Sequence, residues 1–429
     1  MIDVSRDFRI IPYSPVRLSD PFEIRFQNQP ASRATRLAVY LDEDNTPGAL
    51  LCESVSEQTD SGFAYLSKYW LKASEIMSEG RHTLFLHAGD ETAYFELMAE
   101  SSRPVVLDGG FIMFGPPNDR VACDPWRGAL KQLSDEDWKR YIRDMHDIGQ
   151  SCIIINAAVQ LLNIEKKEYA AHYPSKLVKK SDIHAYDPIK AVLCEADELG
   201  MQVFIGIGNN YGGRAALEDW EGDAQVMEEV YQLYGGHASF YGWYIARECN
   251  LINPFPSYLE GAPLVCEKAK ALAPALPLLI SPYLADEGAN YEASLQRMWD
   301  IGFDIFMPQD MMGQRPKCEI RLMSQTRRFH EAARKVCDAT KKHLWGNNEA
   351  FNFTPDGRYL VPRYIGGGMW GEEGFLSQIK AVDPYVEKRM NFMDAAFFTP
   401  PHTNHLPGGE LAVKQYEEYK SYYESEAAK

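Results

Sequence analysis

Two apolar stretches, far apart in the chain, each end on a glutamate. FYGWYIARE runs from Phe240 to Glu248, and HLWGNNEAF runs from His343 to Phe351 with Glu349 near its end. Aromatic and β-branched residues dominate the first stretch, and the second is short and apolar, which favours buried strands. A carboxylate at the end of a buried strand is costly unless it is paired or has a chemical task. Two such carboxylates can supply the proton donor and the nucleophile or base that glycosidic cleavage needs.

Alternation along the two strands predicts which residues share a face with the glutamates. Successive side chains of a strand point to opposite sides. The first strand therefore aligns Gly242, Tyr244 and Ala246 with Glu248, and the second aligns Trp345 and Asn347 with Glu349. We expect both faces to point into one cavity. The alternative for each glutamate alone is a strand-end ion pair with a neighbouring Arg or Lys.

From residue 105 onward, strand patterns alternate with helical patterns in eight pairs. Such a series predicts a (β/α)8 TIM barrel, and an α/β fold class. Ser134 followed by Asp137 resembles a capping box, and Gly149 and Gly200 stand where helices should stop. The expected strands are 105–115, 151–159, 201–209, 240–248, 277–283, 304–310, 343–351 and 391–400. The expected helices cover 134–149, 187–200, 218–234, 256–273, 291–301, 319–340, 372–388 and 410–423.

Polar and aromatic residues follow the expected strand ends, where barrel enzymes place their active sites. Sugars bind to such surfaces because their ring faces stack on aromatic side chains while their hydroxyls pair with amides and charged groups. Asp310 is a third candidate carboxylate, for a substrate hydroxyl, for tuning a glutamate or as one of the catalytic pair, and its alternative is to cap the loop that follows it. The expected substrate-binding residues are Asn209, Asn210, Tyr211, Tyr244, Arg247, Tyr283, Gln309, Asp310, Trp345, Asn347, His402 and His405.

Residues 1–100 read as β-structure without helices, with alternating strands at 22–27, 35–43, 62–71, 80–89 and 92–100. Strands at this spacing predict a small antiparallel, immunoglobulin-like β-sandwich. SSRP at 101–104 reads as a linker. We therefore expect an accessory β-sandwich domain over 1–100 and a catalytic barrel over 105–429.

Charge and composition exclude some classes of binding partner. A net charge of −17 and a pI near 5.1 argue against nucleic acid and anionic membrane surfaces. Eight scattered cysteines without a C-x-x-C pair predict reduced core thiols. No stretch is apolar enough to span a membrane, and the first residues lack a signal-peptide pattern, which favours a cytoplasmic protein; a chain trimmed of its signal peptide would look the same.

No cofactor or metal is expected. GIGNNYGG, Gly206 to Gly213, breaks the G-x-G-x-x-G spacing of a dinucleotide loop. His402 and His405 have no third ligand at metal spacing, so a substrate-facing role is favoured. Two rival interpretations stay open: a carbohydrate-binding barrel without catalysis, and a metal-assisted hydrolase or lyase that uses Asp310, His402 and His405.

The ordered motifs GWYIARE, LLISPY, MPQD and LWGNNEAF resemble a bacterial domain-of-unknown-function family described as TIM-barrel glycosyl hydrolases, over roughly residues 105 to 425. The placement of the glutamates is also similar to that in the large retaining clan of glycosidases. That resemblance implies Glu248 as the acid/base and Glu349 as the nucleophile. The clan usually has Asn before the first glutamate, whereas this chain has Arg247.

Overall fold

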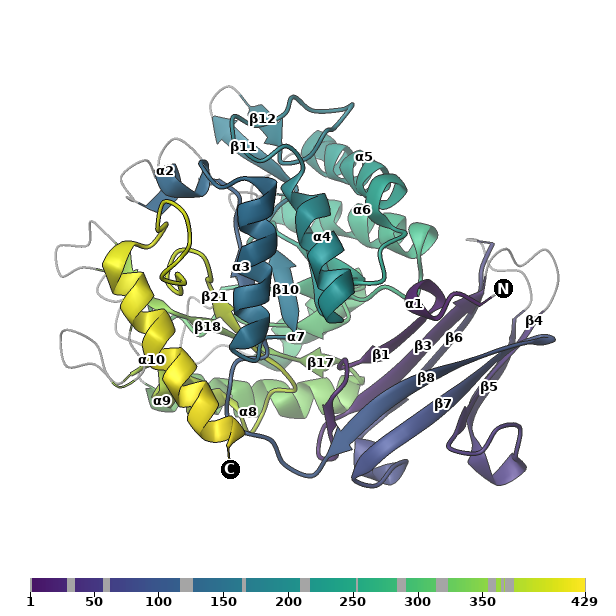
Figure 1. The fold of residues 1–429 in the computed structure, drawn as a ribbon. Helices are drawn as coiled ribbons and strands as arrows, with labels where there is room; N and C mark the ends of the chain where they lie inside the picture. The colour runs from purple at the N-terminus through teal and green to yellow at the C-terminus, as the bar shows by residue number, and fades with distance from the viewer. Residues whose placement is uncertain are drawn as a thin grey trace.

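A computed structural model describes residues 2–28, 35–56, 62–115, 126–163, 167–208, 217–251, 254–283, 291–313, 323–353, 360–363, 366 and 374–428. Its N-terminal part is built from β-sheets, drawn at the lower right of Figure 1. The rest is a parallel sheet surrounded by helices, with the C-terminal helix along its outer side. The predicted architecture of a β-sandwich followed by a barrel is confirmed.

The N-terminal strands form two sheets over a shared apolar core. One has the order β1-β3-β6 and the other β2-β8-β7-β4-β5, and all pairs are antiparallel except β2 with β8. Phe8, Ile24 and Phe26 from the first sheet pack with Leu37 and Leu84 from the second. The strands are β1 Phe8–Ile11, β2 Val16–Arg17, β3 Phe22–Asn28, β4 Thr35–Leu41, β5 Leu50–Ser56, β6 Ala64–Trp70, β7 Gly80–Ala88 and β8 Glu91–Glu100.

The prediction missed β1, β2 and β5, which are short or lack clear alternation. The expectation of no helix was wrong for one turn, α1 (Val4–Asp7), where the Asp3 side chain accepts from the Ser5 N–H and caps the start. Two single turns of 3-10 helix, Pro47–Ala49 and Ala73–Glu75, were also missed.

The parallel strands form a barrel that closes through the stretch 343–351. The first part of this stretch pairs with β16 and the second part with β21, and the change occurs at Trp345. The Trp345 N–H donates to the Phe306 carbonyl on one side, and the Gly346 N–H donates to the Lys388 carbonyl on the other. The sheet order is therefore β17-β16-β15-β14-β13-β10-β9-β21-β18, in which both ends belong to one predicted strand. The strands are β9 Gly109–Ile112, β10 Cys152–Ile155, β13 Gln202–Ile207, β14 Phe240–Ile245, β15 Leu278–Ile280, β16 Ile305–Phe306, β17 His343–Leu344, β18 Gly346–Glu349 and β21 Arg389–Phe392.

Helices cover the outside of the barrel (Figure 1). Because both faces of the sheet are then buried, its strands are almost continuously apolar. The predicted capping box at Ser134 and Asp137 is present, and Gly200 ends its helix in the left-handed region at φ 68°. The helices are α2 Trp126–Leu130, α3 Asp135–Asp147, α4 Pro188–Leu199, α5 Leu217–Tyr234, α6 Pro256–Leu272, α7 Tyr291–Ile301, α8 Met323–Thr340, α9 Phe375–Val382 and α10 Gly409–Ala427.

Some predicted bounds were wrong. The last strand is β21 (Arg389–Phe392), not 391–400, and the helix expected at 372–388 is only α9 (Phe375–Val382). The apolar run after Phe392 forms turns that pack under α10 rather than a strand. Two hairpins in the loops were also missed: β11 (Val159–Asn163) with β12 (Glu168–Ala171), and β19 (Phe351–Phe353) with β20 (Leu360–Pro362).

Tyr13 links the N-terminal sheets to the barrel interior. The Tyr13 ring lies edge-on to the rings of Tyr241 and Trp345, and each of these ring centroids is 5.8 Å from that of Tyr13. The Lys388 ammonium lies 3.9 Å from the centroid of the Tyr13 ring. The Tyr13 hydroxyl donates to the Asp108 carbonyl just before β9. An N-terminal loop therefore fills the barrel at the amino ends of its strands.

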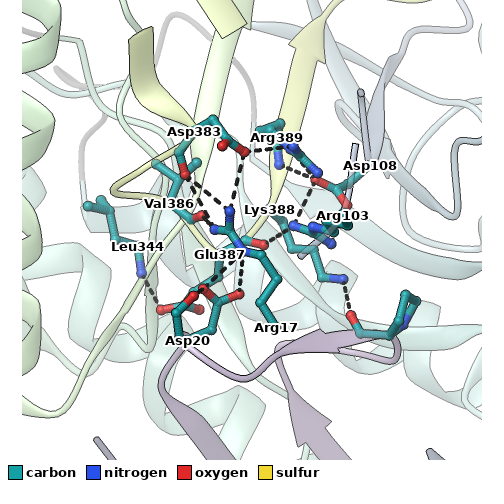
Figure 2. Close-up of polar contacts among 12 residues, drawn as sticks. Arg17, Asp20, Arg103, Asp108, Leu344, Asp383, Val386, Glu387, Lys388 and Arg389 are labelled. Carbon is teal, nitrogen blue, oxygen red and sulfur yellow. Dashed lines mark hydrogen bonds and ion pairs between the residues drawn. The ribbon is translucent and has the colours of Figure 1, made fainter. Parts of the chain in front are cut away.

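Buried and partly buried ion pairs lie around Lys388, whose ammonium donates to the Pro15 carbonyl of the N-terminal part (Figure 2). Arg17 pairs with Asp20 on its own side and with Asp383 on the barrel side. Asp108 accepts from both Arg103 and Arg389. Breaking one partner of such a buried pair leaves an uncompensated charge, which typically costs about 3–5 kcal/mol. The contact between sheets and barrel is therefore sensitive to single substitutions.

Six of the eight cysteines lie in the described part, and each is unpaired there, as expected for reduced thiols. Within the same residues, no helix has the length and apolar character needed to cross a membrane.

Candidate active site

Glu248 and Glu349 line the same small cavity at the carboxyl ends of the barrel strands. Its volume is about 60 Å³, smaller than the roughly 300 Å³ or more of ordinary ligand sites. Four polar residues come from three segments, after β14, after β16 and in β18, and four aromatic residues complete the lining. The lining residues are Phe111, Tyr244, Glu248, Gln309, Asn347, Glu349, Phe351 and Phe392.

Glu248 follows the end of β14 by three residues. The Ala246 N–H still donates to the Ile207 carbonyl of β13, which holds the chain in the direction of the strand. The Glu248 side chain is only partly exposed, and its Oε1 accepts one hydrogen bond, 3.1 Å long, from Gln309 Nε2. Burial raises the pKa of Glu248 to about 7, and the Gln309 hydrogen bond opposes that rise. Glu248 can therefore hold a proton near neutral pH, as a general acid must.

Glu349 is the last residue of β18 and is 2% exposed. Its Oε2 accepts a 2.6 Å hydrogen bond from the Gly313 backbone N–H, which comes from the loop after β16. A Cβ at Gly313 would come within 2.5 Å of the Phe351 carbonyl, so only glycine allows this loop to approach so closely. The loop thereby fixes the orientation of the Glu349 carboxylate.

Asp310 is fully buried, and its carboxylate accepts a hydrogen bond from the backbone N–H of Glu349. Its carboxylate accepts from the Met312 N–H, the Glu349 N–H and the side-chain amides of Asn348 and Gln378. Burial raises its pKa, and these donors oppose the rise. It is not among the residues that line the cavity. The capping role that the sequence left open for Asp310 matches these contacts, whereas the substrate-binding role has no support in them.

Asn347 and Gln309 lie beside the glutamates as predicted. Asn347 Nδ2 donates to Ser281 Oγ at 2.9 Å, and Gln309 Nε2 donates to the Ser281 carbonyl at 3.1 Å. Ser281 follows β15 directly, and it was not singled out from the sequence. The ladder also continues above the strands, since Gln309 and Asn347 form a parallel bridge.

Several predicted residues lie away from this cavity. Arg247 points outward to α5, where it pairs with Asp223, donates to the Asp219 carbonyl and covers the Trp220 ring. Trp345 shares the inward face with Asn347, but it lies deeper in the barrel, against Tyr13, and donates to Glu387. The expected substrate-binding role of Arg247 is therefore wrong, and for Trp345 alternation predicted the face but not the depth.

Tyr283 and the two histidines also lie outside the cavity lining. Tyr283 bridges to Asn250 beyond the ends of β14 and β15. His402 is half-exposed and its Nε2 lies 3.0 Å from Asp144 Oδ2, while His405 is exposed in a turn at φ 62°. Asn209, Asn210 and Tyr211 fall outside the described residues. Within those residues, no group of three or more His, Cys, Asp or Glu side chains could hold a metal ion.

Of the four aromatic residues in the lining, only Tyr244 was predicted from the sequence, and Phe111, Phe351 and Phe392 were missed. Phe111 lies edge-on to Tyr244 and tilted against Phe392, each with ring centroids 5.3 Å apart. Phe351 closes the same wall next to Phe392. Phe351 follows Glu349 by two residues, a spacing that could have found it. Phe111 could not be found from the expected strand, because β9 ends at Ile112 and not at residue 115.

The fold is similar to solved glycosidase structures. The structure of a "putative alpha-L-fucosidase" from Bacteroides thetaiotaomicron matches with a TM-score of 0.55 and 19% identity, over 74% of this chain and 93% of that chain. A beta-glucuronidase from Parabacteroides merdae matches with a TM-score of 0.44, 13% identity and 97% coverage of this chain, which spans 54% of that protein. A glycoside hydrolase family 5 protein from Bacteroides vulgatus gives 0.43 and 14%, over 68% of this chain and 62% of that one. At such identities the first likeness supports the barrel fold alone.

Sequence comparison identifies the family. No curated protein matches the chain. Residues 107–399 match a family described as Domain of unknown function (DUF4434), which covers most of the chain and all of the barrel strands. The chain therefore belongs to the DUF4434 family.

Proposed function

We propose that this protein is a glycoside hydrolase that cleaves an O-glycosidic bond of an oligo- or polysaccharide, with Glu248 as general acid and Glu349 as nucleophile or base. The observation that carries the proposal is the shared cavity: both carboxylates line it, from different strands, in different surroundings. The similarity in fold to a structure described as a putative alpha-L-fucosidase supports a glycosidase in general, without bearing on the two glutamates.

The geometry suits the chemistry in three respects. Glu248, with its pKa raised to about 7, keeps the proton that a leaving oxygen needs. Glu349 is held by Gly313 and supported through Asp310, so its carboxylate has a fixed orientation. The aromatic wall of Phe111, Tyr244, Phe351 and Phe392 offers apolar surface to a sugar ring.

In the proposed reaction, the Glu248 proton passes to the glycosidic oxygen as the bond from that oxygen to the anomeric carbon breaks. The bonding electrons stay with the leaving oxygen. Glu349 either attacks the anomeric carbon or removes a proton from the attacking water. The anomer of the first-formed product, followed by NMR, decides between retention and inversion.

A non-catalytic carbohydrate-binding barrel is the second candidate, because the same aromatic and amide groups would bind sugar without reaction. The two functions separate in one experiment: the wild-type protein and a Glu248→Gln/Glu349→Gln double variant are assayed with a panel of aryl glycosides and oligosaccharides. Turnover by the wild type alone, with sugar binding kept in the double variant by calorimetry, supports hydrolysis. Equal binding without turnover in either protein supports the binding module.

A metal-assisted mechanism through Asp310, His402 and His405 is not favoured. The Asp310 carboxylate is occupied by four donors, and His402 is paired with Asp144 at an exposed site. Activity that survives dialysis against a chelator is expected, and a chelator-sensitive activity would reopen that mechanism.

A further inference from the structure

Gln309 donates a hydrogen bond to Glu248, and a second contact fixes the orientation of its side-chain amide. Gln309 Nε2 donates two hydrogen bonds, both 3.1 Å long: one to Glu248 Oε1 and one to the Ser281 carbonyl. The orientation of a glutamine amide is ordinarily ambiguous, because its oxygen and nitrogen look alike. Here the ambiguity is removed, because a backbone carbonyl can only accept.

The Ser281 carbonyl therefore fixes the NH2 group of Gln309 on this side of its amide. With one N–H directed at the carbonyl, the other is directed at Glu248 Oε1, which must accept. An oxygen that accepts from an amide N–H is disfavoured as the carrier of the acidic proton, since a proton there would face a donor. Oε2 of Glu248 accepts no hydrogen bond from the described residues and is left to carry it.

We propose that Gln309 is a positioning residue for the general acid: anchored by the Ser281 carbonyl, it holds Glu248 Oε1 and directs the catalytic proton to Oε2. This inference rests on the proposed function for its catalytic meaning. It adds a role to the direct contact with substrate that the sequence suggested for Gln309, which lines the cavity. The residue acts on the reaction through Glu248.

The backbone of Gln309 is hydrogen-bonded to the neighbouring segments. The Gln309 N–H donates to the Pro282 carbonyl, and Gln309 pairs with Asn347 in a parallel bridge. The Ser281 hydroxyl accepts from Asn347 Nδ2, so one serine orients two amides of the cavity. Because the backbone at Ser281 and Gln309 is fixed on both sides, the Gln309 side chain has one orientation to offer Glu248.

The Gln309 hydrogen bond also lowers the pKa of Glu248, against the larger effect of burial. Gln309→Met keeps the length of the side chain and removes both donors, so the pKa of Glu248 should rise above its value of about 7. We expect a shift of about 0.5 to 1 pH unit, because the amide binds the ionised carboxylate more strongly than the neutral acid. Gln309→Glu keeps the shape and adds a charge, so it should shift the pKa further in the same direction.

The chain contains a matched control. Gln378 also donates through Nε2 to a carboxylate and to a backbone carbonyl, but its partners are Asp310 and the Glu349 carbonyl. Gln378→Met therefore makes the same chemical change in the same cluster without touching Glu248. It should leave the Glu248 titration in place.

The first test needs no substrate. The carbonyl stretch of the protonated Glu248, identified by its loss in Glu248→Gln, is followed against pH by difference infrared spectroscopy in the wild type and the three glutamine variants. The midpoint should rise in Gln309→Met and Gln309→Glu and stay in Gln378→Met. An unchanged midpoint in both Gln309 variants, or an equal shift in Gln378→Met, overturns the proposal.

The second test separates positioning from general damage. On the low-pH plateau, Gln309→Met should lower kcat/KM about 10-fold for aryl glycosides with poor leaving groups and much less for dinitrophenyl glycosides, which need little protonation. An equal loss for both kinds of leaving group contradicts the assignment. If the wild type cleaves no glycoside, the proposed function fails, while the infrared titration still decides whether Gln309 controls the Glu248 proton.

Discussion

Glu248 and Glu349 line one cavity although they follow different strands, β14 and β18, and are held in different ways. Glu248 is partly exposed and accepts from one amide, whereas Glu349 is almost fully buried and accepts a backbone N–H. Two carboxylates in unlike surroundings can divide the work of acid and nucleophile or base.

The pH dependence of the proposed activity should follow Glu248. Its pKa of about 7 means that the acid form dominates below neutral pH, so kcat/KM should fall about tenfold per pH unit above pH 7. The measurement is a pH profile with a glycoside that has a poor leaving group. Glu248→Gln should abolish this limb together with most of the activity, and a limb that persists in the variant assigns it to another group.

Asp310→Asn should lower the free energy of unfolding, although Asp310 does not line the cavity. The amide would place an NH2 where Asp310 now accepts from four donors, so at least one buried donor loses its acceptor. Such a loss costs about 1–3 kcal/mol. Urea unfolding should show it, and Asp300→Asn on the exposed face of α7 should show almost none. Equal stabilities of the two variants would contradict the supporting role of Asp310.

The interface with the N-terminal sheets should lose stability at alkaline pH. His343 is 1% exposed and lies between Glu23 at 3.1 Å and Glu387 at 2.8 Å; burial opposes its charge, yet the two carboxylates raise its pKa above the ordinary 6.5. The folded state then binds a proton that the unfolded chain releases, so the contribution is complete below pH 6.5 and is lost as pH rises through the folded pKa.

Unfolding free energies measured from pH 5.5 to pH 9 test this linkage. The wild type should become less stable over the upper part of the range, and His343→Gln should be less stable at low pH with a flatter profile. His402→Gln, at the exposed pair with Asp144, serves as the control substitution. A profile for His343→Gln parallel to that of the wild type would show that His343 is neutral in the folded protein.

Tyr13→Ala tests the attachment of the N-terminal sheets. Its ring packs on Tyr241, Trp345 and Lys388, and the side chain is 3% exposed. Truncating a buried aromatic side chain costs about 3–5 kcal/mol. Thermal or urea unfolding should show this loss, whereas Tyr94→Ala, 66% exposed on β8, should change little. A small effect at Tyr13 would mean that the barrel does not depend on this contact.

The barrel and the glutamate pair could be predicted from the sequence because they follow from periodicity. Alternation in FYGWYIARE and HLWGNNEAF correctly placed Tyr244, Glu248, Asn347 and Glu349 on inward faces. The same rule carried no information about depth, so it placed Trp345 in the site when it packs at the opposite end of the barrel. Alternation also requires Arg247 to face outward, opposite to Glu248, and the structure pairs it with Asp223 on α5.

Other features depend on contacts between distant segments. Ser281 and Gln378 matter only because the fold brings them to Gln309 and Asp310. Neither residue carries a local pattern that marks it. The Tyr13 contact is likewise invisible in the sequence, since nothing near residue 13 indicates that this loop enters the barrel.

If Glu248 and Glu349 perform separate steps of glycosidic cleavage, single variants should affect substrates with good and poor leaving groups differently. We would measure kcat/KM of the wild type, Glu248→Gln and Glu349→Gln with paired aryl glycosides that differ only in leaving group. We expect Glu349→Gln to lower kcat/KM for both substrates by several orders of magnitude. Glu248→Gln should lower kcat/KM about 10²- to 10⁴-fold for the substrate with the poor leaving group and change it little for the other. Folded variants that turn over both substrates at the wild-type rate would contradict this division of roles.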